Sequence, residues 1–145
     1  MAIFLPDTSC IIARIAVWHE HHRSARAEIE QRLGRGDEMI LAAHSLIESY
    51  ATLTSFPPTQ RVSPSEALSA LRESFVGRWR VVALEPADYA FLLDDARRRA
   101  ITGGSIYDAA IAACARKGGA TTLLTFNARH FTPLAGPDLE IVVPS

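Results

Sequence analysis

Short apolar segments alternate along this chain with longer segments in which apolar residues recur at helical spacing. The short segments have the length and composition of buried strands, and the longer ones have the pattern of amphipathic helices. Strands that alternate with helices in this way predict an α/β fold with a central parallel sheet and helices on both faces. The predicted strands are Ala2–Leu5, Met39–Ala42, Arg80–Leu84, Thr121–Thr125 and Glu140–Val143. The predicted helices are Cys10–Trp18, Arg23–Leu33, His44–Thr54, Ala67–Val76, Pro86–Arg99 and Ile106–Ala115.

Glycine, proline and serine mark several helix ends. Gly34 follows one helical segment, and Pro64 comes directly after Ser63, in the arrangement of a helix start. We expect Ser105 to cap the nearly all-apolar helix that follows it. The segment Phe126–Phe131 is predicted to form a short turn.

Length and composition are those of one ordinary domain. The chain has 145 residues, of which 48% are hydrophobic and 21% are charged. These values exclude a disordered chain and a small scaffold held together by disulfides. No repeat, low-complexity segment or linker interrupts the pattern, so we expect a single domain over residues 1–145.

Charge and cysteine content narrow the function classes further. The net charge is −1, which argues against a protein that binds nucleic acid through a broad positive field, although a local binding site remains compatible with it. Cys10 and Cys114 lie far apart in apolar surroundings, as expected for free thiols in a reducing compartment. No signal sequence or membrane segment is visible, so a cytoplasmic protein without membrane contact is expected.

Four polar residues lie where a parallel sheet places its functional sites, near the carboxyl ends of strands. Asp7 and Asn127 follow predicted strands, Glu48 lies in the helix after the second strand, and Asp108 lies in the first turn of the apolar helix.

Each of the three carboxylates also has a purely structural interpretation. Asp7 has the position of a helix N-cap, while Ser45-x-x-Glu48 and Ser105-x-x-Asp108 both fit a capping box. Asp108 fits this alternative least well, because its helix is apolar nearly all round and an ionised carboxylate in a buried helix needs a partner.

Carboxylates that converge in a partly buried cleft repel one another, and no lysine lies near any of them in sequence. A divalent cation is the simplest compensation. Because the candidate ligands are all oxygen donors, Mg²⁺ or Mn²⁺ is expected rather than zinc. Such an ion would bind phosphate oxygens of a substrate, and this indicates an enzyme that acts on phosphodiester bonds.

Four segments resemble the successive motifs of PIN domains. They are Leu5-Pro6-Asp7-Thr8-Ser9 before an apolar helix, Glu48 within LIESYATLT, Ile106-Tyr107-Asp108-Ala109 before a run of alanines, and Leu124–Phe131 with its T-x-N-x-R-x-F pattern. Their order and spacing span essentially the whole chain. Within this family the sequence is most similar to the VapC toxins of bacterial toxin–antitoxin pairs.

The resemblance implies a PIN-like three-layer α/β/α fold and a Mg²⁺- or Mn²⁺-dependent endoribonuclease. It also implies a homodimer, an RNA substrate, and a cognate antitoxin protein that inhibits the enzyme by inserting at the active site. Asp7, Glu48 and Asp108 match the family's acidic metal ligands. The supporting positions are Thr8, Ser9, Thr125 and Asn127, the last at a place that is often Asp in the family.

Histidines near these motifs have alternative interpretations. The cluster His19-Glu20-His21-His22 is interpreted as a solvated helix start, because it lacks the i, i+4 histidine pair of a zinc helix. His44 lies one helical turn before Glu48 and could contact it or a phosphate, or could lie on the surface. His130 occupies a position where an acidic residue is common in the family.

Three other functions compete with the toxin. A PIN-like RNA-processing nuclease without an antitoxin would share all of these residues. An aspartyl phosphohydrolase requires a second Asp where Ser9 stands. A non-catalytic domain that only binds RNA or a partner would leave the carboxylates without a purpose beyond capping.

Overall fold

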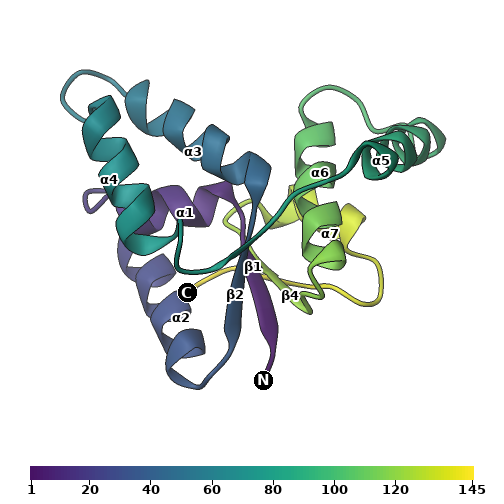
Figure 1. The fold of residues 1–145 in the computed structure, drawn as a ribbon, viewed down its shortest axis with the longest axis horizontal. Helices are drawn as coiled ribbons and strands as arrows, with labels where there is room; N and C mark the ends of the chain where they lie inside the picture. Colours follow the sequence, from purple (N-terminus) through teal and green to yellow (C-terminus); the bar gives the residue numbers. More distant parts are fainter.

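The computed structural model describes residues 1–145 and shows one five-stranded parallel sheet in the order β3-β2-β1-β4-β5 (Figure 1). The strands are β1 (Ile3–Pro6), β2 (Glu38–Ala42), β3 (Arg80–Val82), β4 (Thr122–Leu124) and β5 (Glu140–Val142). The helices are α1 (Thr8–Ile15), α2 (His22–Gly34), α3 (Ala43–Thr54), α4 (Pro64–Ser74), α5 (Pro86–Arg98), α6 (Ser105–Lys117) and α7 (Ala128–Ala135). All predicted strands and six predicted helices are therefore confirmed.

The central strands are buried on both faces, and successive residues enter different cores. On one face, Phe4 and Leu124 pack with residues of α1, α2 and α4. On the other face, Leu5 and Leu123 pack with residues of α5, α6 and α7. Because side chains alternate across a strand, the continuous apolar runs of the sequence supply both cores at once.

The helices form a layer on each side of the sheet, as expected for a three-layer α/β/α fold. In Figure 1, α1 to α4 lie on one side of the strands and α5 to α7 on the other. No helix in the structure has both the length and the apolar character needed to cross a membrane.

Two local predictions are wrong. Helix α6 is capped by Gly104, and Ser105 is its first residue, without a capping role. The segment predicted as a turn enters a helix, α7, which continues past Phe131 and contains Pro133. Pro133 lacks a backbone N–H and disfavours a helix, but the burial of Phe131 and Leu134 against the sheet core stabilises the helix in spite of it.

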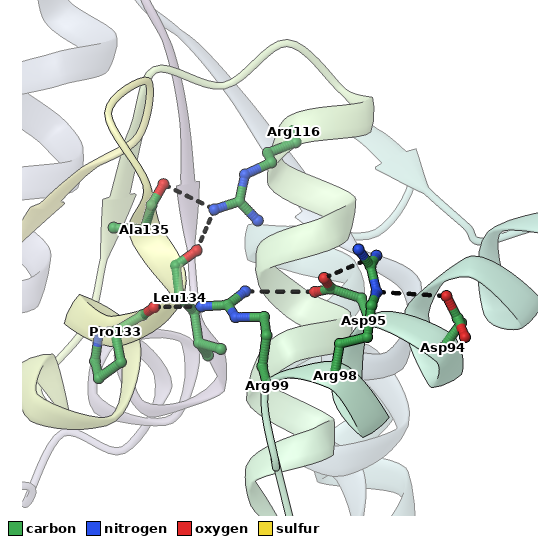
Figure 2. A network of polar contacts seen from close by, with 8 residues as sticks. All are labelled: Asp94, Asp95, Arg98, Arg99, Arg116, Pro133, Leu134 and Ala135. Atoms are coloured by element: carbon green, nitrogen blue, oxygen red, sulfur yellow. Dashed lines mark hydrogen bonds and ion pairs between the residues drawn. The ribbon is translucent and has the colours of Figure 1, made fainter.

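Two arginines satisfy the carbonyl groups at the end of α7. Figure 2 shows Arg116 of α6 donating hydrogen bonds to the carbonyls of Leu134 and Ala135, and Arg99 donating to the carbonyl of Pro133. The last carbonyls of a helix have no partner within the helix, so side chains from α6 and its preceding loop replace the missing bonds. The arginines thereby fix α7, whose first residues border the site described below.

We expect Arg116→Ala to lower the free energy of unfolding by about 1.5–3 kcal/mol, because it leaves two helix-terminal carbonyls without a charged donor. Denaturant unfolding measures this change. Arg98→Ala is the matched control, since exposed Arg98 pairs only with exposed Asp94 and half-buried Asp95 (Figure 2) and should contribute less than about 1 kcal/mol. Equal stability of the two variants would contradict the role of Arg116.

Candidate active site

The sheet order reverses direction between β1 and β4, and a cleft of about 480 Å³ opens beyond their carboxyl ends. This is the place where open α/β sheets bind ligands, because the loops that follow the two strands separate there. Asp7, Glu48 and Asp108 all line the cleft, together with Thr8, Ser9 and Asn127. The fold thus brings together three carboxylates, from the residue after β1 and from α3 and α6.

Asp7 is the most buried of the three, with 3% of its surface exposed. Its Oδ1 accepts hydrogen bonds from the hydroxyl of Ser9 at 2.6 Å and the backbone N–H of Cys10 at 3.0 Å. Its Oδ2 accepts one from the hydroxyl of Thr125 at 2.6 Å. Asp7 is therefore the N-cap of α1, as the structural interpretation had it, and a carboxylate of the cleft as well.

The predicted supporting residues hold Asp7 and its surroundings. Ser9 and Thr125 each donate to one oxygen of Asp7, so its carboxylate plane is constrained from both sides. Thr125 is fully buried and also accepts from the backbone N–H of Asn127. Thr8 turns toward α3, where its hydroxyl donates to Ser45 at 3.1 Å.

The capping interpretation of Glu48 and Asp108 is wrong. The caps of α3 and α6 are Ala42 and Gly104, and neither helix has a capping box. Both carboxylates extend into the cleft, where each meets one histidine. His44 Nε2 lies 3.6 Å from Glu48 Oε2, and His130 Nδ1 lies 3.6 Å from Asp108 Oδ2.

The surroundings of the cleft disfavour the ionised forms of Asp7 and Asp108. Burial raises the pKa of Asp7 in spite of its three hydrogen bonds, and nearby Asp108 raises it further. Burial also raises the pKa of Asp108, and the charge of Glu48 adds to this effect, while His130 opposes it. Protonation of either carboxylate, or a cation bound to it, therefore offsets the cost of holding its charge in a buried and acidic site.

Asn127 occupies the N-cap position of α7, but its side chain makes no capping hydrogen bond. It lines the cleft directly after β4, where an amide offers a carbonyl oxygen without a charge.

Sequence reasoning missed one wall of the cleft. The connection between α1 and α2 brings His19, Glu20 and His21 to the cleft, and Phe126 lies beside them. His21 is the N-cap of α2 and His22 its first residue, so the interpretation as a helix start is confirmed for these two residues, whereas His19 and Glu20 lie before the helix. No local pattern could have placed this connection, because it reaches the cleft only through the packing of α1 and α2 on the sheet.

The donor set suits a hard divalent cation. The acidic groups Asp7, Glu20, Glu48 and Asp108 line the cleft, but no group of three or more His, Cys, Asp or Glu side chains in the structure is arranged to hold a metal ion. Mg²⁺ is commonly held by one or two carboxylates while it keeps several waters and meets substrate phosphate. The residues present fit this open mode of coordination.

Comparison with known proteins identifies the family of this chain and two related ribonucleases. The family model described as PIN domain matches residues 4–136. Ribonuclease VapC40 of Mycobacterium tuberculosis is 35% identical over 118 residues, covering 81% of this chain and 82% of that protein. Ribonuclease VapC27 of the same organism is 32% identical over 109 residues, covering 75% of this chain and 74% of its own.

Solved structures share the fold at low sequence identity. VapBC2 from Rickettsia felis, crystallised with a DNA fragment from its promoter, superposes with a TM-score of 0.70 at 19% identity over 99% of both chains. Mycobacterium tuberculosis VapC20, a sarcin-ricin loop cleaving toxin, superposes with a TM-score of 0.68 at 19% identity, covering 91% of this chain and 95% of that one.

Proposed function

The chain belongs to the PIN-domain family, and from this membership we propose that it is a divalent-metal-dependent endoribonuclease, the toxin of a VapBC-type toxin–antitoxin pair. The observation that carries the proposal is the convergence of Asp7, Glu48 and Asp108 in one cleft at the point where the sheet order reverses. Relatives that cover most of the chain are ribonucleases of the VapC type.

We propose that Asp7, Glu48 and Asp108 hold Mg²⁺ or Mn²⁺. Burial raises the pKa of both Asp7 and Asp108, with smaller contributions from the charge of Asp108 on Asp7 and of Glu48 on Asp108. This supports the proposal, because a bound cation would stabilise the ionised carboxylates. When bound, such an ion supplies activation of a water molecule and neutralisation of the leaving oxygen.

The protein's own residues position this chemistry. Ser9, Thr125 and the N–H of Cys10 hold the carboxylate of Asp7 in one orientation, so that it can bind without reorganising. Thr125 also accepts a hydrogen bond from the backbone N–H of Asn127, whose amide we expect to face the RNA in the cleft. His44 Nε2 and His130 Nδ1 each lie 3.6 Å from one carboxylate oxygen, of Glu48 and of Asp108 respectively, and border these side chains.

We propose two protein partners in the cytoplasm. One is a cognate antitoxin, supported by the VapBC and FitAB complexes among the structural neighbours, and an arginine of such a partner would pair with the carboxylates of the cleft. The other is a second copy of the chain, supported by large apolar side chains that α5 leaves exposed, Tyr89, Phe91 and Leu93.

The direct test is cleavage of bacterial total RNA by the purified chain, with the cut ends mapped by sequencing. We expect cuts at defined positions with Mg²⁺ or Mn²⁺ and no cuts in EDTA, because the carboxylates alone offer no electrophile for the leaving oxygen. Intact RNA under both metals would overturn the ribonuclease, and equal cleavage in EDTA would overturn its dependence on a metal.

A further inference from the structure

One wall of the cleft is built from aromatic rings. His19, His21, Phe56 and Phe126 line it, whereas no lysine or arginine lines the cleft at all. The phosphates of RNA therefore find no fixed cationic side chain there. A substrate must gain part of its affinity from contacts that do not depend on charge.

Two of these rings already form a stack. The rings of His21 and Phe126 lie with their centroids 4.3 Å apart and their planes 10° from parallel. They come from the α1–α2 connection and from the residues after β4, which are distant in sequence. Planar rings in this arrangement form a surface on which a further flat ring can pack.

Hydrogen bonds tie this stack to the carboxylate site. The backbone N–H of Phe126 donates to Ser9 Oγ at 3.0 Å, and the Ser9 hydroxyl donates to Asp7 Oδ1 at 2.6 Å. Ser9 thus links the backbone that carries the Phe126 ring directly to Asp7. A base held at this stack would belong to a nucleotide close to the phosphate that Asp7 faces.

The α1–α2 connection is also held in place. The backbone N–H of His21 donates to Nδ1 of His19 at 3.0 Å, and Nδ1 of His22 lies 2.9 Å from the carbonyl oxygen of Ala13. The carboxylate of Glu20 lies 3.4 Å from Nε2 of His21. Each histidine of the cluster therefore has a different contact, and together they present the His21 ring to the cleft.

We propose that the His21–Phe126 pair is a nucleobase subsite, which stacks a base of single-stranded RNA next to the cleaved phosphodiester. The inference rests on the proposed ribonuclease function. Stacking accepts every base, because every base has a flat face, so the subsite contributes affinity and alignment rather than a strict sequence code. It also explains how a cleft without lysine or arginine holds a polyanion.

The experiment uses a short RNA that spans a cut site mapped with the wild-type protein. In two versions of this RNA, the base on one or the other side of the cut is replaced by an abasic residue. Cleavage by wild type, His21→Ala and His21→Phe is measured as KM and kcat. Tyr50→Ala is the matched control, because Tyr50 is a partly exposed aromatic residue about 160° around α3 from Glu48.

For the wild type, we expect removal of one of the two bases to raise KM by about tenfold, the effect of one lost base stack. His21→Ala should raise KM by a similar factor on intact RNA and should lose the response to base removal. His21→Phe should retain both the low KM and the response, because it keeps an aromatic ring, and Tyr50→Ala should behave as wild type.

Two results would overturn the subsite. One is an equal response of wild type and His21→Ala to both abasic RNAs, and the other is a KM of His21→Phe as high as that of His21→Ala. Thermal melting of each variant identifies misfolding. If His21→Ala is misfolded, Phe126→Leu replaces it in the comparison, because leucine keeps an apolar side chain without a ring. A wild type that cleaves no RNA would overturn the proposed function itself, and the subsite with it.

Discussion

Asp108→Asn will reduce RNA cleavage by more than about a hundredfold and leave the fold intact. Loss of an outer partner of a metal ligand costs roughly 10–100-fold, so a larger loss identifies Asp108 as a group that binds the ion directly. The substitution is well suited to this test, because the side chain of Asp108 makes one ion-pair contact, with His130, and has no hydrogen-bonded role in capping α6. An amide keeps the shape and removes the charge.

Asp7→Asn will abolish cleavage as well, but it will also destabilise the protein. Three donors converge on the carboxylate oxygens of Asp7, and an amide offers only one oxygen to accept them. The loss of activity in this variant therefore mixes two causes.

Asp94→Asn provides the control for Asp108→Asn, since it removes an exposed carboxylate of α5 outside the cleft. It should cleave RNA at the wild-type rate. Cleavage by Asp108→Asn within about tenfold of wild type would remove Asp108 from the set of direct ligands.

Manganese will raise the melting temperature of the wild-type protein by about 5–10 °C at a free concentration of roughly 100 Kd, because an ion bound only by the folded state stabilises that state. Asp108→Asn should lose most of this increase. Calorimetry or fluorescence melting with and without EDTA measures the shift without any reference to RNA cleavage. An equal shift in both proteins would place the ion elsewhere.

Without metal, in EDTA at pH 7, Asp108→Asn will have a higher free energy of unfolding than the wild type. Burial and Glu48 raise the pKa of Asp108 in the folded state above its ordinary value of 3.8. Protonated Asp108 therefore favours folding, and this contribution is lost as the pH rises through the raised pKa. Asparagine mimics the protonated form at every pH.

The gain in stability should disappear below about pH 4, where Asp108 is protonated in both states. Melting temperatures of the two proteins measured across this range test the sign. If the wild type is instead the more stable protein at pH 7 without metal, the attraction of His130 for Asp108 outweighs burial and the charge of Glu48.

The sequence by itself determined the order of the elements, because strand and helix periodicity is a local property of side-chain spacing. Continuous apolar runs such as Met39–Ala42 indicated strands buried on both faces. The helix start predicted at Ser63 and Pro64 appears in the structure, where Ser63 and Glu66 form a capping box. Asp7, Glu48 and Asp108 could be selected as candidates because parallel strands place their carboxyl ends at one edge.

Only the tertiary structure decided what each candidate contacts. The sequence pattern S-x-x-E/D allowed Glu48 and Asp108 to be capping residues. The structure excludes this role, because the N-caps of the two helices are Ala42 and Gly104 instead. Thr125 donates to Asp7 because β1 and β4 are neighbours in the sheet, although they are distant in the chain.

The aromatic wall and α7 depend on packing in the same way. Phe126 meets His21 only after β4 and the α1–α2 connection have been brought to the same edge of the sheet. Helix α7 forms in spite of Pro133 because buried Phe131 and the donors Arg99 and Arg116 stabilise it from other elements. Periodicity specifies which face of a segment is apolar. Contacts between segments distant in sequence depend on how the whole core packs, and a local sequence pattern does not determine that packing.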